Sequence, residues 1–286
     1  MNGVNFEPAA FILSVLCLIF SLTINKRQYK LPAGIKNKLL NQHFMFLMLI
    51  LNNIVSSASS VGGVYLQAMA SKEIVFWQYL LHAFYFISHT TLSICFALYI
   101  MNINGSSMGR GRGFYVVFAL PYLISELLIL TNGFTGFVFY LDDQFVYHRS
   151  PGMVVAYITG FIYLLLGFVF FFRYQRAISG TDRKVVGVLI GFTAAGVIIQ
   201  GLYPEQVVEL YFESLTFLGL MMILEERSGH IDPATGALNR VALMDASRRM
   251  IETEQPYQVV LVKLTNLNLF SNLLDGRDLD SMLIQI

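Results

Sequence analysis

Charged residues are scarce in this chain: they make up 13% of its 286 residues, whereas 56% are hydrophobic. Soluble globular domains carry about twice that share of charge, so the composition argues against an ordinary water-soluble protein. The formal net charge is only +1, which argues against the concentrated basic surface that nucleic-acid binding requires. We therefore expect lipid as the solvent and no nucleic-acid partner.

Cysteine is almost absent, since only Cys17 and Cys95 occur. Both lie inside apolar stretches, a setting that predicts packing residues rather than a disulfide framework or a metal site. The His-Glu-x-x-His spacing of zinc proteases is missing as well, which argues against an intramembrane metalloprotease. We predict neither a metal site nor a catalytic residue in the apolar part.

The chain has seven apolar runs long enough to cross a bilayer, whose core of about 30 Å takes about 20 helical residues. They cover residues 8–24, 39–66, 74–101, 114–131, 153–172, 185–202 and 207–224. No basic residue precedes the first run, so it lacks the charged start of a signal peptide and should remain as an anchor. The predicted fold is an all-α polytopic membrane bundle of seven helices.

Lysine and arginine gather on one side of these runs. The connections after the first, third and fifth runs hold eleven of them, whereas the connections on the other side hold only Lys72 and Arg149. Short loops rich in basic residues stay in the cytoplasm. We therefore predict a multi-pass plasma-membrane protein whose N-terminus lies outside and whose residues from Glu225 onward are cytoplasmic.

The one long outer connection, residues 132–152, has aromatic and β-branched residues on both sides of a polar turn at Asp142-Asp143-Gln144. This pattern predicts an outer β-hairpin. Asp142, Asp143, His148 and Arg149 are candidate ligand contacts; the alternative is a structural cap whose polar residues are solvated. The paired aspartates lack the spaced oxygen ligands of a calcium loop, so no metal is predicted there.

Several polar residues interrupt the apolar runs: Asn52, Asn53, His82, His89, Glu126, Gln200, Glu209 and Glu213. Such groups are costly inside a membrane unless they are paired, and they often mark a pathway or a pocket. Glu209 and Glu213 are one turn apart and share a helix face. We select His89, Glu126 and Glu209 as pocket candidates; the alternative is helix association through hydrogen bonds worth about 1 kcal/mol each.

A soluble segment follows the last run, and this order favours a receptor with a cytoplasmic output. The runs show no two-half symmetry of the kind found in many transporters. A membrane scaffold or a transporter with a non-enzymatic tail is the alternative. We divide the chain into a sensor domain (1–224), a signalling linker (225–231) and a soluble segment (232–286).

The soluble segment opens with the sequence DPATGALNR at residues 232–240. It resembles the entry motif of GGDEF domains, the diguanylate cyclase family, written D-x-L-T-G-L-x-N-R. The matching positions are Asp232, Thr235, Gly236, Leu238, Asn239 and Arg240, while Ala234 and Ala237 replace leucines. A helix over 240–253 and a buried strand over 258–267 are predicted next, in the family's order. This partial α/β unit cannot close a sheet alone, so its other strands should lie beyond Ile286 or in another molecule.

Intact members of this family bind GTP and Mg²⁺, and the resemblance can be followed to their site. Lys263 stands where a metal-binding Asp is expected, and a cation there repels magnesium. Ser271 falls on a guanine-contacting Asn, whereas Asp280 falls on a guanine-contacting Asp and is the candidate for a weak guanine contact. The GGDEF signature itself is absent from these residues. The resemblance thus implies a degenerate, regulatory domain that needs no cofactor and makes no cyclic di-GMP.

The outer connection also carries a resemblance. Its stretch TGFVFY at 135–140, followed by Tyr147-His148-Arg149, is similar to the seven-transmembrane sensor at the N-terminus of some bacterial histidine kinases and diguanylate cyclases. Together the two resemblances imply a bacterial inner-membrane receptor that senses an unknown small molecule or a membrane stimulus. They imply a cyclic di-GMP output, a homodimer formed through the cytoplasmic domain, and a longer form that could carry a phosphodiesterase domain. Only Gly229 could act as a hinge after the last helix, so we expect movement of that helix to reach the output domain directly.

Overall fold

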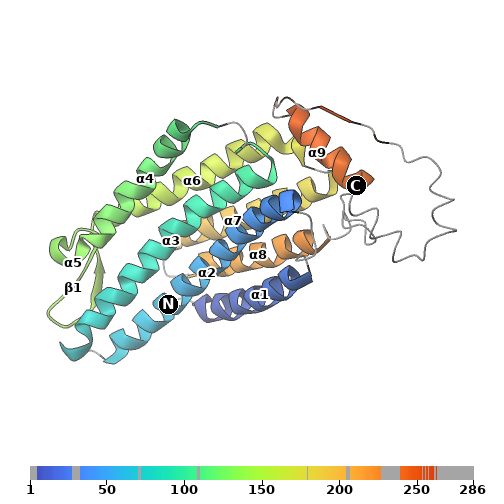
Figure 1. Cartoon of the computed structure of the whole chain (residues 1–286). Helices are drawn as coiled ribbons and strands as arrows, with labels where there is room; N and C mark the ends of the chain where they lie inside the picture. The colour runs from blue at the N-terminus through green and yellow to red at the C-terminus, as the bar shows by residue number, and fades with distance from the viewer. Residues whose placement is uncertain are drawn as a thin grey trace.

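The chain folds into a bundle of long helices with one small β-hairpin (Figure 1). The structure is a computed structural model that describes residues 5–27, 33–69, 72–107, 110–178, 180–203, 207–226, 239–252, 254, 256, 258–260 and 262. Its elements, in chain order, are α1 (Glu7–Arg27), α2 (Ala33–Met69), η2 (Lys72–Ile74), α3 (Val75–Ile103), α4 (Arg112–Leu130), α5 (Asn132–Thr135), β1 (Phe139–Leu141), β2 (Tyr147–Arg149), α6 (Met153–Tyr174), η3 (Gln175–Ala177), α7 (Gly180–Leu202), α8 (Glu209–Glu226) and α9 (Arg240–Glu252).

Five helical segments are long and apolar enough to cross a membrane, which makes the chain a membrane protein. They are His43–Met69, Lys72–Ile103, Arg112–Leu130, Met153–Ala177 and Arg183–Leu202. Five of the seven predicted spans are therefore confirmed in length and composition. Within α1 the described apolar stretch, Glu7–Thr23, is shorter, and α8 carries four glutamates, Glu209, Glu213, Glu225 and Glu226. Seven spans, and the side of the membrane on which each end lies, stay predictions.

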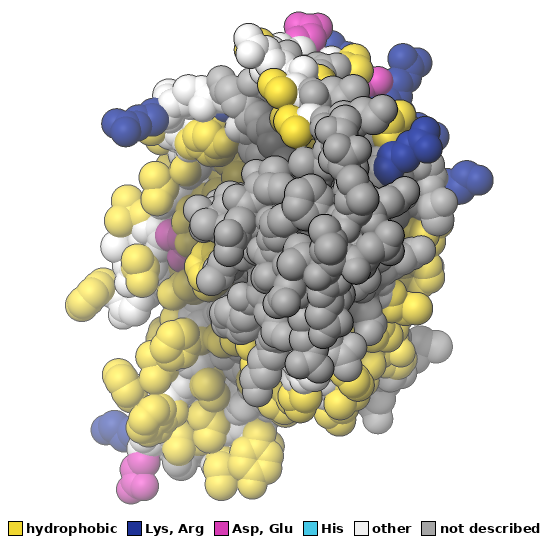
Figure 2. All heavy atoms as spheres, turned by 45° about the vertical axis from the view of Figure 1, so that its right-hand side comes forward, with side chains coloured by type: hydrophobic (Ala, Val, Ile, Leu, Met, Phe, Trp, Pro, Cys, Tyr) yellow, Lys and Arg dark blue, Asp and Glu magenta, His cyan; other side chains and the backbone are white. Residues whose placement is uncertain are grey.

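The outer surface of the bundle suits lipid. Large apolar side chains such as Leu123, Ile124 and Leu127 are exposed along α4, which water would penalise and hydrocarbon chains would not. Figure 2 shows hydrophobic side chains along the flanks of the described part, while most of the Lys and Arg in view lie at the end that carries α9. This distribution is what a membrane-embedded flank with one basic end would present.

The interior joins α2, α3 and α8 through aromatic packing. The ring of Phe46 on α2 lies 5.9 Å from that of Tyr99 on α3 and 6.5 Å from that of Phe217 on α8. All three side chains are almost completely buried. Because α3 also packs against α4 and α6, it is the helix around which the other elements are arranged.

The predicted hairpin is confirmed. Strands β1 and β2 pair antiparallel with Phe139 opposite Arg149 and Leu141 opposite Tyr147. The buried ring of Phe139 packs on His82 and Phe86 of α3, so the hairpin is fixed to the end of the bundle rather than free in solution. We call this the hairpin end; α9 lies at the opposite end, the α9 end (Figure 1).

The soluble segment is described only in part. Helix α9 confirms the helix predicted over 240–253, and it packs against η3 at the α9 end. The predicted strand is not formed at 258–260, where Val259 and Val260 are exposed. A strand needs a partner for its backbone groups, and no described residue supplies one to this stretch. Residues 232–238, Lys263, Ser271 and Asp280 lie outside the described residues.

Candidate functional site

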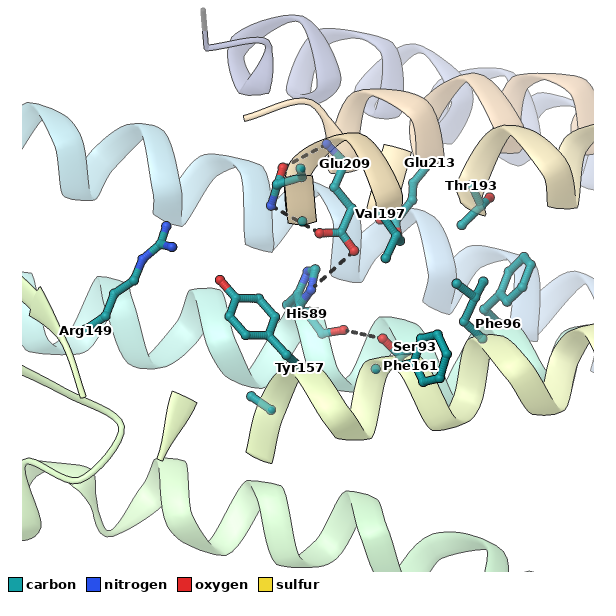
Figure 3. A pocket seen from close by; sticks show the side chains of 15 residues that line it. His89, Ser93, Phe96, Arg149, Tyr157, Phe161, Thr193, Val197, Glu209 and Glu213 are labelled. Carbon is teal, nitrogen blue, oxygen red and sulfur yellow. Dashed lines mark hydrogen bonds and ion pairs between the residues drawn. The ribbon is translucent and has the colours of Figure 1, made fainter. Parts of the chain in front are cut away.

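A cavity of about 340 Å³ opens inside the bundle between α3, α6, α7, α8 and the end of β2 (Figure 3). Its volume lies in the range of about 300–1,000 Å³ that is typical of small-molecule sites. The residues that line it are His89, Ser93, Phe96, Arg149, Ala156, Tyr157, Gly160, Phe161, Leu164, Thr193, Val197, Gln200, Gly201, Glu209 and Glu213. The cavity thus combines an acidic pair, an imidazole, aromatic rings and one guanidinium.

The acidic pair lies on the first turns of α8. Glu209 and Glu213 are only 9% and 8% exposed, and both reach the cavity from the same helix face because they are four residues apart. Gln200 of α7 holds Glu209 in place: its Nε2 donates to Glu209 Oε2 at 3.1 Å. Its Oε1 accepts from the backbone amides of Val208 and Glu209, at 3.0 Å each. Gln200 therefore caps the start of α8, where amides have no partner within the helix.

His89 of α3 faces Glu209 across the cavity. Its Nε2 lies 3.6 Å from Glu209 Oε1, which is an ion pair whenever the imidazole is protonated. Tyr85 stacks on the imidazole ring with a centroid distance of 5.7 Å and an interplanar angle of 12°. Nδ1 of His89 is buried and finds no hydrogen-bond partner among the described residues. The imidazole is thus fixed in position beside Glu209.

Glu213 lies deeper and is tied to the neighbouring helices. Asn53 of α2 donates from Nδ2 to Glu213 Oε2 at 3.5 Å and to the carbonyl of Leu210 at 3.3 Å. Ser14 of α1 donates to Asn53 Oδ1 at 3.2 Å. For Asn53 these contacts match the helix-association alternative, because one side chain joins α1, α2 and α8 through hydrogen bonds.

Arg149 and the aromatic residues form the rest of the wall. Figure 3 places Arg149 at one side of the group and Phe96 at the other, with Tyr157, His89 and Glu209 between them. Arg149 is exposed at the end of β2 and makes no ion pair with a carboxylate in the described part of the chain. Gly160 of α6 faces α3, and a Cβ there would lie 3.4 Å from Ser93 Oγ, an ordinary contact distance.

The structure separates the sequence-based candidates into two groups. His89 and Glu209 meet in the cavity, whereas Glu126, Asp142 and His148 are not among the residues that line it. Glu126 of α4 is buried and accepts a hydrogen bond from Thr90 of α3. Asp280 lies outside the described residues.

Asp142 and His148 pair with each other inside the hairpin. His148 Nε2 lies 2.8 Å from Asp142 Oδ2. Asp142 Oδ1 also accepts from the amides of Gln144 and Val146, at 2.9 Å each. The hydrogen bonds from Val146 and His148 hold the pKa of Asp142 below its usual value. These contacts match the structural-cap alternative for the hairpin.

The sequence reasoning did not select several wall residues. Tyr157 and Phe161 belong to α6, whose many aromatic and aliphatic residues give no pattern that separates a cavity wall from a lipid-facing side. Gln200 and Glu213 did carry a signal, as polar residues in apolar runs. Of the hairpin candidates, Arg149 lines the cavity and Asp143 does not. Among the described residues, no group of three or more His, Cys, Asp and Glu could hold a metal ion. The arrangement is suited to reversible binding of a small polar molecule.

Comparisons with known proteins add no name to this site. No family model, no curated protein and no solved structure matches the chain.

Proposed function

We propose that this chain is a membrane signal receptor whose cavity binds a small molecule and whose helices relay the binding to the C-terminal segment. The observation that carries the proposal is a shared set of helices. Helices α6 and α7 line the cavity toward the hairpin end, and η3 joins them at the α9 end, where α9 packs against it. A change of shape in the cavity would therefore reach α9 through rigid elements.

Helix α8 supports a second route to the same output. It carries Glu209 and Glu213 in the cavity, and the chain continues from its last residue, Glu226, toward α9. Movement of an acidic side chain toward a ligand would shift this helix, and the shift would be passed on along its axis.

The output that we propose is cyclic di-GMP signalling through a degenerate GGDEF-like domain. The proposal rests on the entry motif at 232–240 and on the order of elements after it, of which α9 is described. Lys263 in place of a metal-binding Asp supports a regulatory domain without cyclase activity. In this proposal the receptor lies in the bacterial inner membrane and forms a homodimer through its cytoplasmic domain. A guanine contact at Asp280 belongs to this proposal.

The relay can be tested without knowing the ligand, by filling the cavity with a side chain. In a chain whose Cys17 and Cys95 are replaced by alanine, spin labels are attached at Arg176→Cys in η3 and Met244→Cys in α9, both exposed positions. Electron resonance in lipid nanodiscs then gives the distribution of distances between the labels. Val197→Phe, which intrudes into the cavity, should shift that distribution.

The matched control is Val188→Phe on the same helix, because Val188 is exposed and does not line the cavity. It should leave the distribution as in the parent chain. Equal distributions for both variants would remove the relay and favour a membrane scaffold. A shift together with uptake of solute into proteoliposomes would favour a transporter instead.

A further inference from the structure

We infer that the cavity binds a zwitterionic small molecule, with its cationic nitrogen at Glu209 and Glu213 and its anionic group at Arg149. The inference rests on the proposed receptor function and names the class of ligand. It comes from a mismatch of charge inside the cavity, from the aromatic residues in its wall and from the position of Arg149.

The cavity wall holds a surplus of carboxylates. Glu209 and Glu213 are both buried, and neither forms an ion pair with a described lysine or arginine. His89 can supply one positive charge to Glu209 at 3.6 Å, but Glu213 has only the Asn53 amide, at 3.5 Å. Two carboxylates in a medium of low dielectric constant are both charged only when a cation compensates them, and otherwise one of them binds a proton. A ligand with a positive charge would therefore find carboxylates here that no described lysine or arginine neutralises.

The aromatic residues of the wall indicate what kind of cation fits. Tyr157, Phe161 and Phe96 line the same cavity, and Tyr85 stacks on the far side of His89. Aromatic faces attract organic cations such as ammonium groups. A bare metal ion would instead need several hard ligands around it, and the described residues form no such group. The wall thus favours an organic ammonium group.

Arg149 lies at another side of the cavity from the acidic pair (Figure 3). Arg149 lines it from the end of β2 and has no carboxylate partner in the described part of the chain. A guanidinium binds a carboxylate or a phosphate through two parallel hydrogen bonds. One molecule that carries both an ammonium and such an anion would satisfy Arg149 and the acidic pair together. A volume of about 340 Å³ suits a single small molecule or a lipid headgroup.

Two sources could supply this chemistry: a free amino acid or betaine, and the headgroup of a zwitterionic phospholipid. The test uses the full chain in nanodiscs of phosphatidylglycerol, which has no amine. Free α-amino acids and glycine betaine are added separately, and the midpoint of thermal unfolding, Tm, is measured. At least one zwitterion should raise Tm. A simple alkylamine and a simple carboxylate, each with a single charge, should raise it much less.

The lipid arm compares the same chain in nanodiscs of phosphatidylethanolamine mixed with phosphatidylglycerol and in phosphatidylglycerol alone. A higher Tm in the mixture that disappears in Glu209→Gln and Arg149→Gln would identify the headgroup as the source. In either arm, each of these two variants should weaken binding roughly tenfold to hundredfold, as expected for the loss of one charged hydrogen-bonded contact. Glu126→Gln, a buried carboxyl outside the cavity, should bind as the parent does.

The inference is overturned if an alkylamine binds as well as the zwitterions and Arg149→Gln has no effect, or if neither source raises Tm. It is also overturned if Glu126→Gln weakens binding as much as Glu209→Gln. The spin-label test of the receptor function uses no ligand. A relay that responds to Val197→Phe while no zwitterion binds would therefore refute the ligand class and leave the receptor proposal standing.

Discussion

Two neighbouring residues of α3 meet buried carboxylates in very different surroundings. Thr90 donates to Glu126 of α4 in a closed contact, whereas His89 faces Glu209 of α8 across a cavity. Successive helix residues point about 100° apart, so one helix presents both situations at the same depth. A polar group in a membrane helix is therefore a binding candidate only where the packing of neighbouring side chains leaves space around it.

The closed side is closed by Tyr163 of α6. Its hydroxyl donates to the carbonyl of Phe118 at 2.6 Å and accepts from the amide of Tyr122 at 3.2 Å. Phe118 and Tyr122 lie on α4 on either side of Pro121, and this proline removes a backbone donor from the helix. Six residues earlier on α6, Tyr157 lines the open cavity. A tyrosine is therefore fully packed on one side of α6, at Tyr163, and borders the cavity on the other, at Tyr157.

The largest expected effect is the conversion of the closed side into a second cavity. Tyr163 is 0% exposed and Tyr157 is 45% exposed. Tyr163→Ala should lower the free energy of unfolding by about 3–5 kcal/mol, because it removes a fully buried ring and leaves a void. Tyr157→Ala should lower it by about 1 kcal/mol. Denaturant titration in mixed micelles measures both.

Tyr163→Phe separates the two contributions of this side chain. It keeps the ring and removes the hydroxyl, so it should lower the free energy of unfolding by about 1 kcal/mol through the loss of that group's hydrogen bonds. The Tyr122 amide and the Phe118 carbonyl are four residues apart in α4 and can still pair with each other. Equal losses in Tyr163→Ala and Tyr157→Ala would mean that the two sides of α6 are packed alike, and the comparison would fail.

A smaller effect is expected where the open side is tied to the rest of the bundle. Asn53→Ala removes the hydrogen bonds to Glu213 and to the carbonyl of Leu210, and it leaves a buried carboxylate without that donor. We expect the free energy of unfolding to fall by about 1–2 kcal/mol. The adjacent residue is the control: within the described part of the chain, the side chain of Asn52 donates only to the carbonyl of Met48 in its own helix. Asn52→Ala should cost less than about 0.5 kcal/mol, and a larger loss than in Asn53→Ala would contradict the assignment.

The sequence predicted some of these features because they are local. The hairpin is signalled by a pattern within residues 139–149, where aromatic and β-branched side chains flank the turn at Asp142, and it formed as predicted. The pairing of His89 with Glu209 depends on how α3 and α8 pack, which no local pattern encodes. Glu126 and Glu209 carried a similar signal in the sequence, an acidic residue in an apolar run. Only the packing around them separates a helix contact from a cavity.

A third prediction concerns the cap that positions the acidic pair. Gln200→Leu removes the acceptor for the Val208 and Glu209 amides and should lower the free energy of unfolding by about 1 kcal/mol, a typical value for a lost helix cap. It should also weaken zwitterion binding, because Glu209 loses its donor from Gln200 Nε2. Gln78→Leu on α3 is the matched control, since the Gln78 side chain is buried, makes no hydrogen bond to the described residues and does not line the cavity. An unchanged Tm for Gln200→Leu would show that α8 needs no cap from α7.

The smallest effect is expected at the Asp142–His148 pair of the hairpin, which does not line the cavity. The amide of Val146 and the imidazole of His148 lower the pKa of Asp142 in the folded state, whereas an unfolded chain has an Asp pKa of about 3.9. The stabilisation is therefore present above the unfolded pKa and is lost as the pH falls through the lowered, folded pKa. Hydrogen exchange at the Val146 amide, corrected for the intrinsic rate, should accelerate as the pH falls below about 4. Asp142→Asn should abolish this pH dependence, and Asp143→Asn should keep it. A pH dependence that survives in Asp142→Asn would assign the effect to another group.

Because the hairpin also carries Arg149 at the end of β2, looser pairing of the two strands at low pH should weaken zwitterion binding as well. This effect would connect the hairpin to the open side of the bundle.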